Sequence, residues 1–301
     1  MRKKVGLVFA GGGGKGAYEI GVWEALKETG LDRDIQAISG SSVGGLNAAL
    51  FLQGDLEKAK QIWQKISTAI ILYSKREARK ERKKTGIPLE EKGFSMFARD
   101  GLYRLIEENL DMGVFDSSKI NCYMTCVRAK HLPKKTGIPA IKYFNVREFN
   151  KQERMRILLA TSAIPFIFPQ EKIGGYYYYD GGSQLKGDNL PLKPLIEREH
   201  CDTVIVVHLD RDVERKNIDP SVYPGVRIYE IRPKDDQGGL FKGILDFKAE
   251  SATERILQGY NDNIDMFRHI EEDREMLQSG AEKRVQMILG LKHMQEKIRK
   301  E

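Results

Sequence analysis

A serine with a glycine two positions away on either side is the residue of this chain best placed to act as a nucleophile. The segment Gly40-Ser41-Ser42-Val43-Gly44 has the form Gly-x-Ser-x-Gly, and its centre is Ser42. In such a turn between strand and helix, small neighbours let the backbone close sharply and leave the hydroxyl exposed. The alternative is an ordinary serine- and glycine-rich loop. We favour a nucleophile, because a predicted strand precedes the segment and a helix of small residues follows it.

A glycine run near the amino terminus, Gly11-Gly12-Gly13-Gly14-Lys15-Gly16, offers backbone N–H groups with no side chains over them. Such groups at the start of a helix can stabilise the negative oxygen of a tetrahedral intermediate. The run also fits the Gly-x-Gly-x-x-Gly fingerprint of dinucleotide-binding proteins, which needs an acidic residue at the end of the second strand. Residues 36–40 contain none. The phosphate-loop pattern fails too, because neither Ser nor Thr follows Lys15. A nucleotide-binding protein is therefore the weaker alternative.

An aspartate followed by two glycines, Asp180-Gly181-Gly182, ends a predicted aromatic strand. Asp-Gly is also a frequent turn dipeptide, so a purely structural role is the alternative. A partly desolvated carboxylate can accept the proton of a serine hydroxyl directly. If Asp180 is not the base, His208 is the next candidate. All the histidines are otherwise interpreted as ordinary core or surface residues: His131, His200, His208, His269 and His293.

The elements that must position these residues follow an α/β pattern. A short apolar strand at 5–10 leads through the glycine run to a helix at 17–29, and a second strand at 36–39 leads to a helix at 43–52. Adjacent parallel strands would bring the glycine run and Ser42 to one carboxyl edge of a sheet. Further helices are predicted at 55–65 (capped by Asp55), 99–110, 154–162 and from 247 onward, and further strands at 122–127, 140–146, 176–179, 203–209 and 226–231.

The composition is that of a globular protein, with 301 residues, 41% hydrophobic and 31% charged. The net charge is +7, and residues 75–84 carry much of the excess. A basic balance can indicate nucleic acid, an anionic membrane or no specific partner; we expect no nucleic-acid partner. The three cysteines give no disulfide framework or zinc-site spacing, which favours a cytoplasmic location. Residues 5–10 are too short an apolar run for a signal peptide, and no stretch is long enough to span a membrane.

Together these segments resemble the patatin-like phospholipase family. The glycine run is similar to the family's oxyanion segment, and Gly40 to Ala48 is similar to its nucleophile elbow. Residues 160–165, Phe168-Pro169 and Tyr179 to Gly182 resemble the approach to its catalytic aspartate, and Asp188 to Pro191 resembles the Asn-x-Pro that follows. Asp246-Phe247 with Gly259-Tyr260 fits its closing helix. Residues 183–187 are longer than the family's compact form. The resemblance covers about 5–262.

The resemblance implies a three-layer α/β/α fold with a mainly parallel central sheet and a helical tail. It implies a serine acyl hydrolase (phospholipase A, lysophospholipase or acylglycerol esterase) that uses a Ser-Asp dyad and neither metal nor cofactor. Ser42 would be the nucleophile and Asp180 the proton acceptor. The oxyanion donors would be the N–H groups of Gly12, Gly13, Gly14 and Val43, and Lys15 would be structural. The motif glycines would be Gly11, Gly16, Gly40, Gly44, Gly181 and Gly182.

We expect one catalytic domain at 1–262, with a variable, basic, cap-like region at 66–100, followed by a helical tail at 263–301. The apolar residues Ile66 and 69–72 next to the basic run predict peripheral contact of 66–84 with an anionic membrane, and an ordinary solvated helix is the alternative. The tail could pack on the domain, pair with another subunit or touch lipid. A scaffold that binds lipid or a partner without catalysis is the alternative function.

Overall fold

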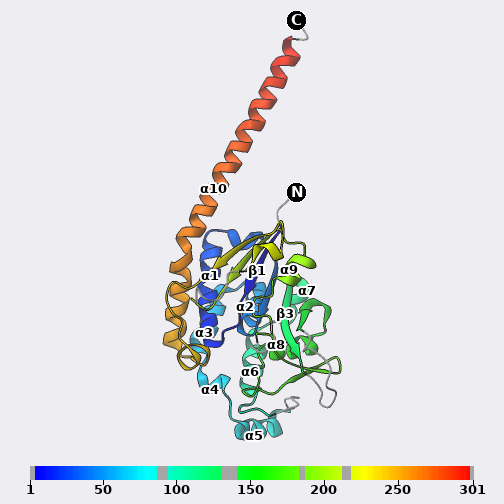
Figure 1. Cartoon of the computed structure of the whole chain (residues 1–301), viewed down its shortest axis with the longest axis vertical. Coiled ribbons are helices and arrows are strands. Elements are labelled where there is room, and N and C mark those ends of the chain that lie inside the picture. Colours follow the sequence, from blue (N-terminus) through cyan, green and yellow to red (C-terminus); the bar gives the residue numbers. More distant parts are fainter. Residues whose placement is uncertain (1–3, 87–93, 130–140, 183–186, 212–217, 299–301) are drawn as a thin grey trace.

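A computed structural model describes residues 4–86, 94–129, 141–182, 187–211 and 218–298, and only the backbone of 220, 274, 275 and 277–298. An eight-stranded sheet forms its centre, with the order β5-β6-β3-β2-β1-β7-β8, and β4 pairs with β3 off this path (Figure 1). Its strands are β1 (Val5–Phe9), β2 (Ile35–Ser41), β3 (Asn121–Arg128), β4 (Ile141–Asn145), β5 (Glu171–Ile173), β6 (Tyr176–Asp180), β7 (Thr203–Val207) and β8 (Arg227–Ile231).

The predicted mainly parallel sheet is confirmed. Strand β1 pairs in parallel with β2 and β7, β2 pairs with β3, and β7 pairs with β8. The pairs β3–β4, β3–β6 and β5–β6 are antiparallel. The glycine run after β1 and Ser42 after β2 therefore do lie at the carboxyl ends of neighbouring parallel strands.

Both faces of the sheet are covered, as the three-layer fold predicts. Leu7 and Phe9 of β1 pack into a large cluster with side chains of the helices on one face, whereas Val8 packs on the other face with Leu195 of α9 and its N-cap Leu192. The strand is therefore apolar throughout rather than alternating. The helices are α1 (Ala17–Glu28), α2 (Val43–Gln53), α3 (Leu56–Lys65), α4 (Thr68–Ile71), α5 (Lys75–Thr85), α6 (Asp100–Asn109), α7 (Val114–Ser117), α8 (Lys151–Thr161), α9 (Lys193–Glu197) and α10 (Ala249–Ile298).

The predicted C-terminal helix is present as α10, which runs without a break from Ala249 to Ile298 and extends away from the sheet (Figure 1). Its first part packs against α1 at a crossing where Gly21 faces the carbonyl of Ile256. A Cβ atom on Gly21 would lie only 1.9 Å from that oxygen. The buried side chain of Phe267 shows that this packing continues past residue 262. The division at 262 stays a prediction.

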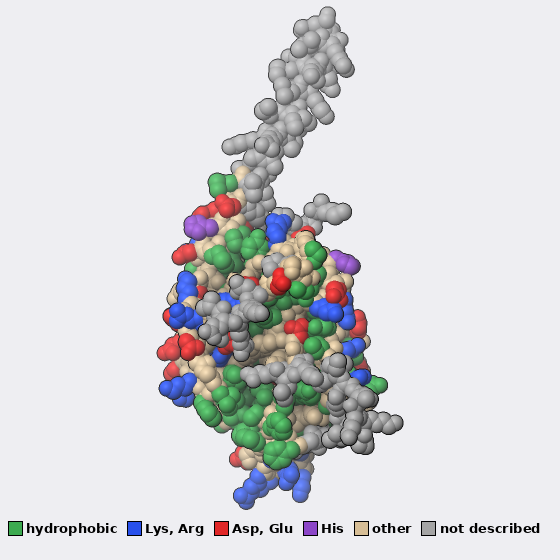
Figure 2. Space-filling model, viewed as in Figure 1, with side chains coloured by type: hydrophobic (Ala, Val, Ile, Leu, Met, Phe, Trp, Pro, Cys, Tyr) green, Lys and Arg blue, Asp and Glu red, His purple; other side chains and the backbone are tan. Residues whose placement is uncertain are grey.

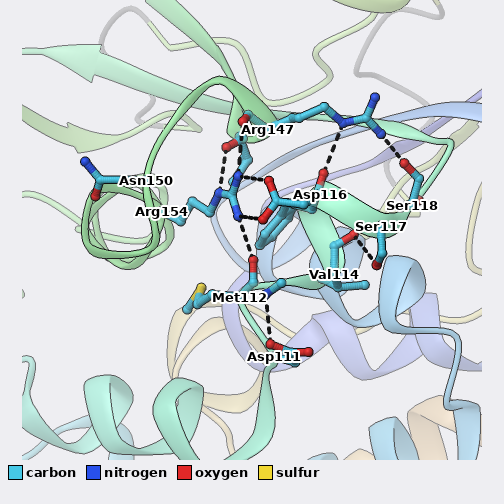
Figure 3. A network of polar contacts seen from close by, with 12 residues as sticks. Asp111, Met112, Val114, Asp116, Ser117, Ser118, Arg147, Asn150 and Arg154 are labelled. Atoms are coloured by element: carbon cyan, nitrogen blue, oxygen red, sulfur yellow. Dashed lines mark hydrogen bonds and ion pairs between the residues drawn. The ribbon is translucent and has the colours of Figure 1, made fainter.

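Helix α8 is fixed to the turns beside it by the buried side chain of Arg154 (Figure 3). Its guanidinium donates to the carboxylate of Asp116 on α7, with Nη1 2.7 Å from Oδ2, and to the carbonyls of Met112, Val146 and Arg147. A charge-assisted pair with several further hydrogen bonds holds one geometry well. The far end of α8, at Thr161, is thereby held in place beside the carboxyl edge of the sheet.

The predicted cap-like region at 66–100 contains α4, α5 and a short antiparallel bridge between Tyr73 and Ala98. Two of the apolar residues expected to contact a membrane, Ile66 and Ile71, are instead buried in the main core. Contact of 66–84 with an anionic membrane stays a prediction. No helix among the described residues is long and apolar enough to cross a membrane. The cytoplasmic location stays a prediction.

Candidate active site

Ser42 occupies the sharp turn between β2 and α2. Its backbone has φ 54° and ψ −127°, and such a positive φ is rare for a residue with a side chain. The flanking glycines make the turn possible. A Cβ atom on Gly40 would lie 2.3 Å from the backbone of Gly44, and one on Gly44 would lie 2.3 Å from the carbonyl oxygen of Phe9. The predicted Gly-x-Ser-x-Gly turn is thus a strained strand-to-helix turn.

Asp180 reaches Ser42 through the pairing of β3. Strand β2 ends with Ser41 opposite Thr125, and Asp180 of β6 is opposite the next residue, Cys126. Strand β4 pairs with residues 123–127 of β3 and so occupies its other edge. Strands β2 and β6 therefore follow one another along a single edge of β3. The end of each strand delivers one polar side chain to the same point.

Asp180 is 4% exposed, and this burial raises its pKa to about 6. Three interactions oppose the rise: the Ser42 hydroxyl, the N–H of Gly182, which donates to Oδ1 at 2.7 Å, and the positive charge of Arg99. No described residue makes a fully formed hydrogen bond to Oδ2. A buried carboxylate with one unsatisfied oxygen beside a serine is poised to accept a proton near neutral pH.

Thr161, the last residue of α8, connects both members of the pair. Its Oγ1 accepts a hydrogen bond from the N–H of Ser42 at 3.1 Å and donates to the carbonyl of Thr125 at 2.8 Å. Its own carbonyl accepts from the N–H of Gly181 at 3.3 Å. One fully buried residue thus ties the turn at Ser42, β3 and the turn after Asp180 together.

The glycine run lies beside Ser42 and is held by Asn189. The side-chain amide of Asn189 accepts from the N–H of Gly11 at 3.0 Å and donates to its carbonyl at 3.1 Å. Beyond it, Gly13 has φ 58° and begins a 3₁₀ turn, η1 (Gly13–Gly16). Within the described chain, no acceptor binds the N–H groups proposed for the oxyanion, namely those of Gly12, Gly13, Gly14 and Val43.

Lys15 is buried and pairs with Asp210, with Nζ 2.6 Å from Oδ1. This pair fastens the glycine run to the end of β7. The last turn before α10 closes over the run as well, because a Cβ atom on Gly14 would lie 2.0 Å from the carbonyl oxygen of Asp246. Arg255 of α10 in turn binds Asp246 and the carbonyl of Gly14.

A cavity of about 100 Å³ adjoins Ser42. Val43 and Gly13 line it with the serine, and the remaining wall is nearly all apolar and comes from α2, α3, α4, α6, α8 and the residues after α8. Ile66 and Ile71 belong to this wall. The other apolar lining residues are Leu46, Leu50, Ile62, Trp63, Leu102, Leu105, Ile106, Leu110, Leu158, Ile164, Phe168 and Phe247. A hydrocarbon chain is the chemical group that such a wall accommodates.

The histidines do not form a triad in the described structure. Nε2 of His208 lies 2.8 Å from Oε2 of Glu230 on β8. Burial and the charge of Arg232 lower the pKa of His208 to about 4. His269 is on α10 beside Glu272, and His200 is exposed. His131, the side chain of His293 and residues 183–186, where the sequence departs from the compact family form, lie outside the description.

Arg99 is a buried residue of this site that the sequence did not single out. Its guanidinium donates to the carbonyl of Ser162 at 2.8 Å and its Oγ at 3.0 Å, and also to the carbonyl of Leu159. It thus caps the end of α8 and lowers the pKa of Asp180. Its position in a stretch that matches no motif gave no signal. Thr161 and Asn189 lay in segments that resemble the family, but without a role.

The family model for patatin-like phospholipases matches residues 7–196, more than half of the chain. The chain belongs to the patatin-like phospholipase family. A lysophospholipase, nte1 of Aspergillus terreus, is 47% identical over 49 residues, which are 16% of this chain and 3% of that protein. The chain thus matches only a small part of that relative's length.

Solved structures with a similar backbone include two further proteins. VipD from Legionella pneumophila is 15% identical, with a TM-score of 0.44, and the match covers 89% of this chain and 67% of that one. Human GIVD cytosolic phospholipase A2 in complex with methyl gamma-linolenyl fluorophosphonate is 10% identical, with a TM-score of 0.49, and the match covers 90% of this patatin-like chain and 59% of that one.

Proposed function

We propose that the protein is a serine lipid acyl hydrolase that cleaves carboxylic esters through Ser42 and Asp180. The observation that carries the proposal is the meeting of a strained, buried serine and a buried aspartate of raised pKa on one edge of β3, beside an apolar cavity. Membership of the patatin-like phospholipase family supports a lipid ester as substrate. Phospholipids, lysophospholipids and acylglycerols share the acyl ester and are the candidates.

The proposed reaction has two halves. In the first, Oγ of Ser42 attacks the ester carbonyl while Asp180 takes the hydroxyl proton, and the N–H groups of Gly12, Gly13, Gly14 and Val43 stabilise the oxyanion. The carbon–oxygen bond to the alcohol breaks, and Asp180 returns the proton to that alcohol. In the second half, water gives its proton to Asp180 and attacks the acyl-serine. The fatty acid then leaves and Ser42 regains its proton.

We assign the acyl chain of the substrate to the cavity beside Ser42. Its wall is apolar, and the polar groups that reach it, such as Ser42 and Asn47, are few. Removing a methylene group from water contributes about 0.8 kcal/mol. Esters with longer acyl chains should therefore bind more tightly until the chain fills the cavity.

The test is hydrolysis of p-nitrophenyl esters of graded chain length by wild type, Ser42→Ala and Asp180→Ala. We expect both variants to lose at least a thousandfold in kcat while keeping the wild-type circular dichroism spectrum. A fluorophosphonate probe should label wild type and not Ser42→Ala, because only an activated serine reacts. A folded wild type that hydrolyses no ester and takes no label would favour a non-catalytic scaffold instead.

A further inference from the structure

Three large apolar side chains are exposed together, two at the end of the cap-like region and one in the loop after α8. Phe94 is 78% exposed, Met96 is 54% exposed and Phe166 is 68% exposed. The N–H of Met96 donates to the carbonyl of Phe166 at 2.9 Å, so the two segments that carry them are paired. Ser95 between them is buried, whereas Phe94 and Met96 both face solvent. Phe166 belongs to the segment next to theirs, because Ser95 forms an isolated bridge with it.

The backbone at Phe166 is strained in a way that its exposed ring does not explain. Its φ is 67°, which is rare for a bulky residue and unfavourable by about 1–3 kcal/mol. Nearby residues of the same loop, Ile164 and Phe168, turn inward and line the cavity beside Ser42. The loop therefore presents an aromatic ring to the outside immediately beyond the cavity wall.

The basic helix α5 borders this patch. Its inner side carries buried Ala78 and Arg82, which pairs with Asp100 at the start of α6. At 100° per residue, the opposite side carries exposed cations. The helix follows directly on Tyr73, whose carbonyl accepts from Ala98 in the segment that also carries Phe94 and Met96. The outward cations are Arg76, Arg79, Lys80, Lys83 and Lys84.

Apolar and basic side chains thus gather at one end of the molecule. Figure 2 shows hydrophobic side chains across its lower end and Lys or Arg side chains beneath them, where Figure 1 places α5. Strand β1 starts near the amino terminus at the upper end and runs toward this end, so the carboxyl edge that carries Ser42 faces it as well (Figure 1). The long helix α10 leaves at the opposite end.

We propose that these residues form a docking surface for an anionic phospholipid bilayer: Phe94, Met96 and Phe166 enter the interface, and the outward cations of α5 bind the headgroups. Exposed aromatic and Met side chains next to a row of cations match the apolar boundary and negative charge of such a membrane. The buried residues Ile66 and Ile71 take no part. The value of this orientation to catalysis rests on the proposed function, whereas the binding itself does not.

The experiment measures binding to vesicles of phosphatidylcholine alone or with phosphatidylserine, by sedimentation, in a Ser42→Ala background that cannot degrade them. We expect the partition coefficient to rise at least tenfold with the anionic lipid and to fall as salt increases. Lys80→Glu/Lys83→Glu should lower it at least tenfold. Phe94→Ser/Met96→Ser should lower it about tenfold, because the inserted apolar groups are lost.

Matched controls separate this surface from general charge and hydrophobicity. Arg33→Glu/Lys119→Glu changes the net charge equally, at exposed residues just before β2 and β3 on the opposite edge of the sheet. Tyr229→Ser removes a half-exposed aromatic ring from edge strand β8. Both should bind as the parent does. With Ser42 restored, the docking variants should hydrolyse a short soluble ester at the wild-type rate.

Two results would overturn the proposal. The first is that the parent protein stays in the supernatant with both kinds of vesicle. The surface would then be assigned to binding a protein partner instead of a membrane. The second is equal loss of binding in the docking variants and their controls. If the wild type does not hydrolyse a soluble ester, the proposed function is contradicted, but the result of the vesicle experiment still stands.

Discussion

The N–H of Ser42 donates a hydrogen bond to Oγ1 of Thr161 at 3.1 Å, and this bond joins the turn between β2 and α2 to the end of α8. The two residues are 119 positions apart in the sequence. The same hydroxyl donates to Thr125 on β3, one position before the partner of Asp180. Thr161 is thus placed to hold the serine at a fixed position relative to the aspartate.

Replacing Thr161 with Val, which keeps the shape but removes the hydroxyl, should lower kcat about tenfold or more and leave KM nearly unchanged. The buried N–H of Ser42 and carbonyl of Thr125 would lose their partner, which costs about 1–3 kcal/mol of stability. Thr161→Ser should restore kcat. Kinetics on a short ester and a denaturant titration measure the two effects. Equal kcat for the Val and Ser variants would exclude the positioning role.

The pH dependence of kcat/KM should follow the ionisation of Asp180. Because its pKa is raised to about 6, the base is mostly ionised at pH 8 and mostly protonated at pH 5. The rate should fall about tenfold for each pH unit below about 6. A profile that stays flat down to pH 4.5 would assign the base to another group.

Asp180→Asn should inactivate the protein and stabilise it at alkaline pH. The pKa in the fold, about 6, exceeds the ordinary 3.8, so the folded state holds its proton longer than the unfolded state. The aspartate's contribution to stability is therefore fully present below pH 3.8 and is lost as pH rises through about 6. The neutral Asn avoids this loss, which is about 3 kcal/mol at pH 8. Thermal melts at pH 4 and 8 measure it, and a gain that is equal at both would contradict the ionisation argument.

Arg99→Met should destabilise the fold and shift the acid limb of the pH–rate profile to higher pH. The substitution leaves the carbonyls of Leu159 and Ser162 without their buried donor, which costs about 3 kcal/mol or more. It also removes the charge that lowers the pKa of Asp180. Arg99→Lys should keep the limb near its wild-type position. Activity profiles of both variants separate this electrostatic effect from a purely structural one.

Chain-length preference should respond to the α6 side of the cavity. Leu105 lines the cavity and is only partly buried, so Leu105→Trp can narrow the space at a small cost in stability. We expect hydrolysis of long acyl esters to fall about tenfold relative to butyrate. Tyr103→Trp, on the same helix but not in this wall, is the matched control. If the ratio of the hydrolysis rates of long and short esters does not change, the acyl chain does not bind in this cavity.

The sharp turn at Ser42, the parallel strands and the order of the first elements were predictable from sequence because their signals are local. Gly40 and Gly44 flank Ser42 within five residues, and the Asp55 cap of α3 lies next to the helix that it starts. The meeting of β2 and β6 on one edge of β3 could not be predicted, since it depends on the register of strands far apart in the chain.

The burial of Ile71 and the burial of Arg99 escaped the sequence analysis for the same physical reason. An apolar residue such as Ile71 looks alike in sequence whether it faces lipid or a cavity, because periodicity gives a face and not the neighbour of that face. Arg99 looks alike whether it is solvated or fully buried, because only tertiary contacts show that its guanidinium satisfies carbonyls of α8.

The proposed catalytic pair, Ser42 and Asp180, and the cavity wall come largely from different stretches of the chain. The pair is mounted on β2, β3, β6 and the end of α8, whereas much of the wall comes from α3, α4 and α6 between residues 56 and 110. Substitutions in that stretch can therefore change which acyl chain the cavity admits without changing Ser42 or Asp180. Arg99 lies in the same stretch and has to be retained, because it holds the end of α8.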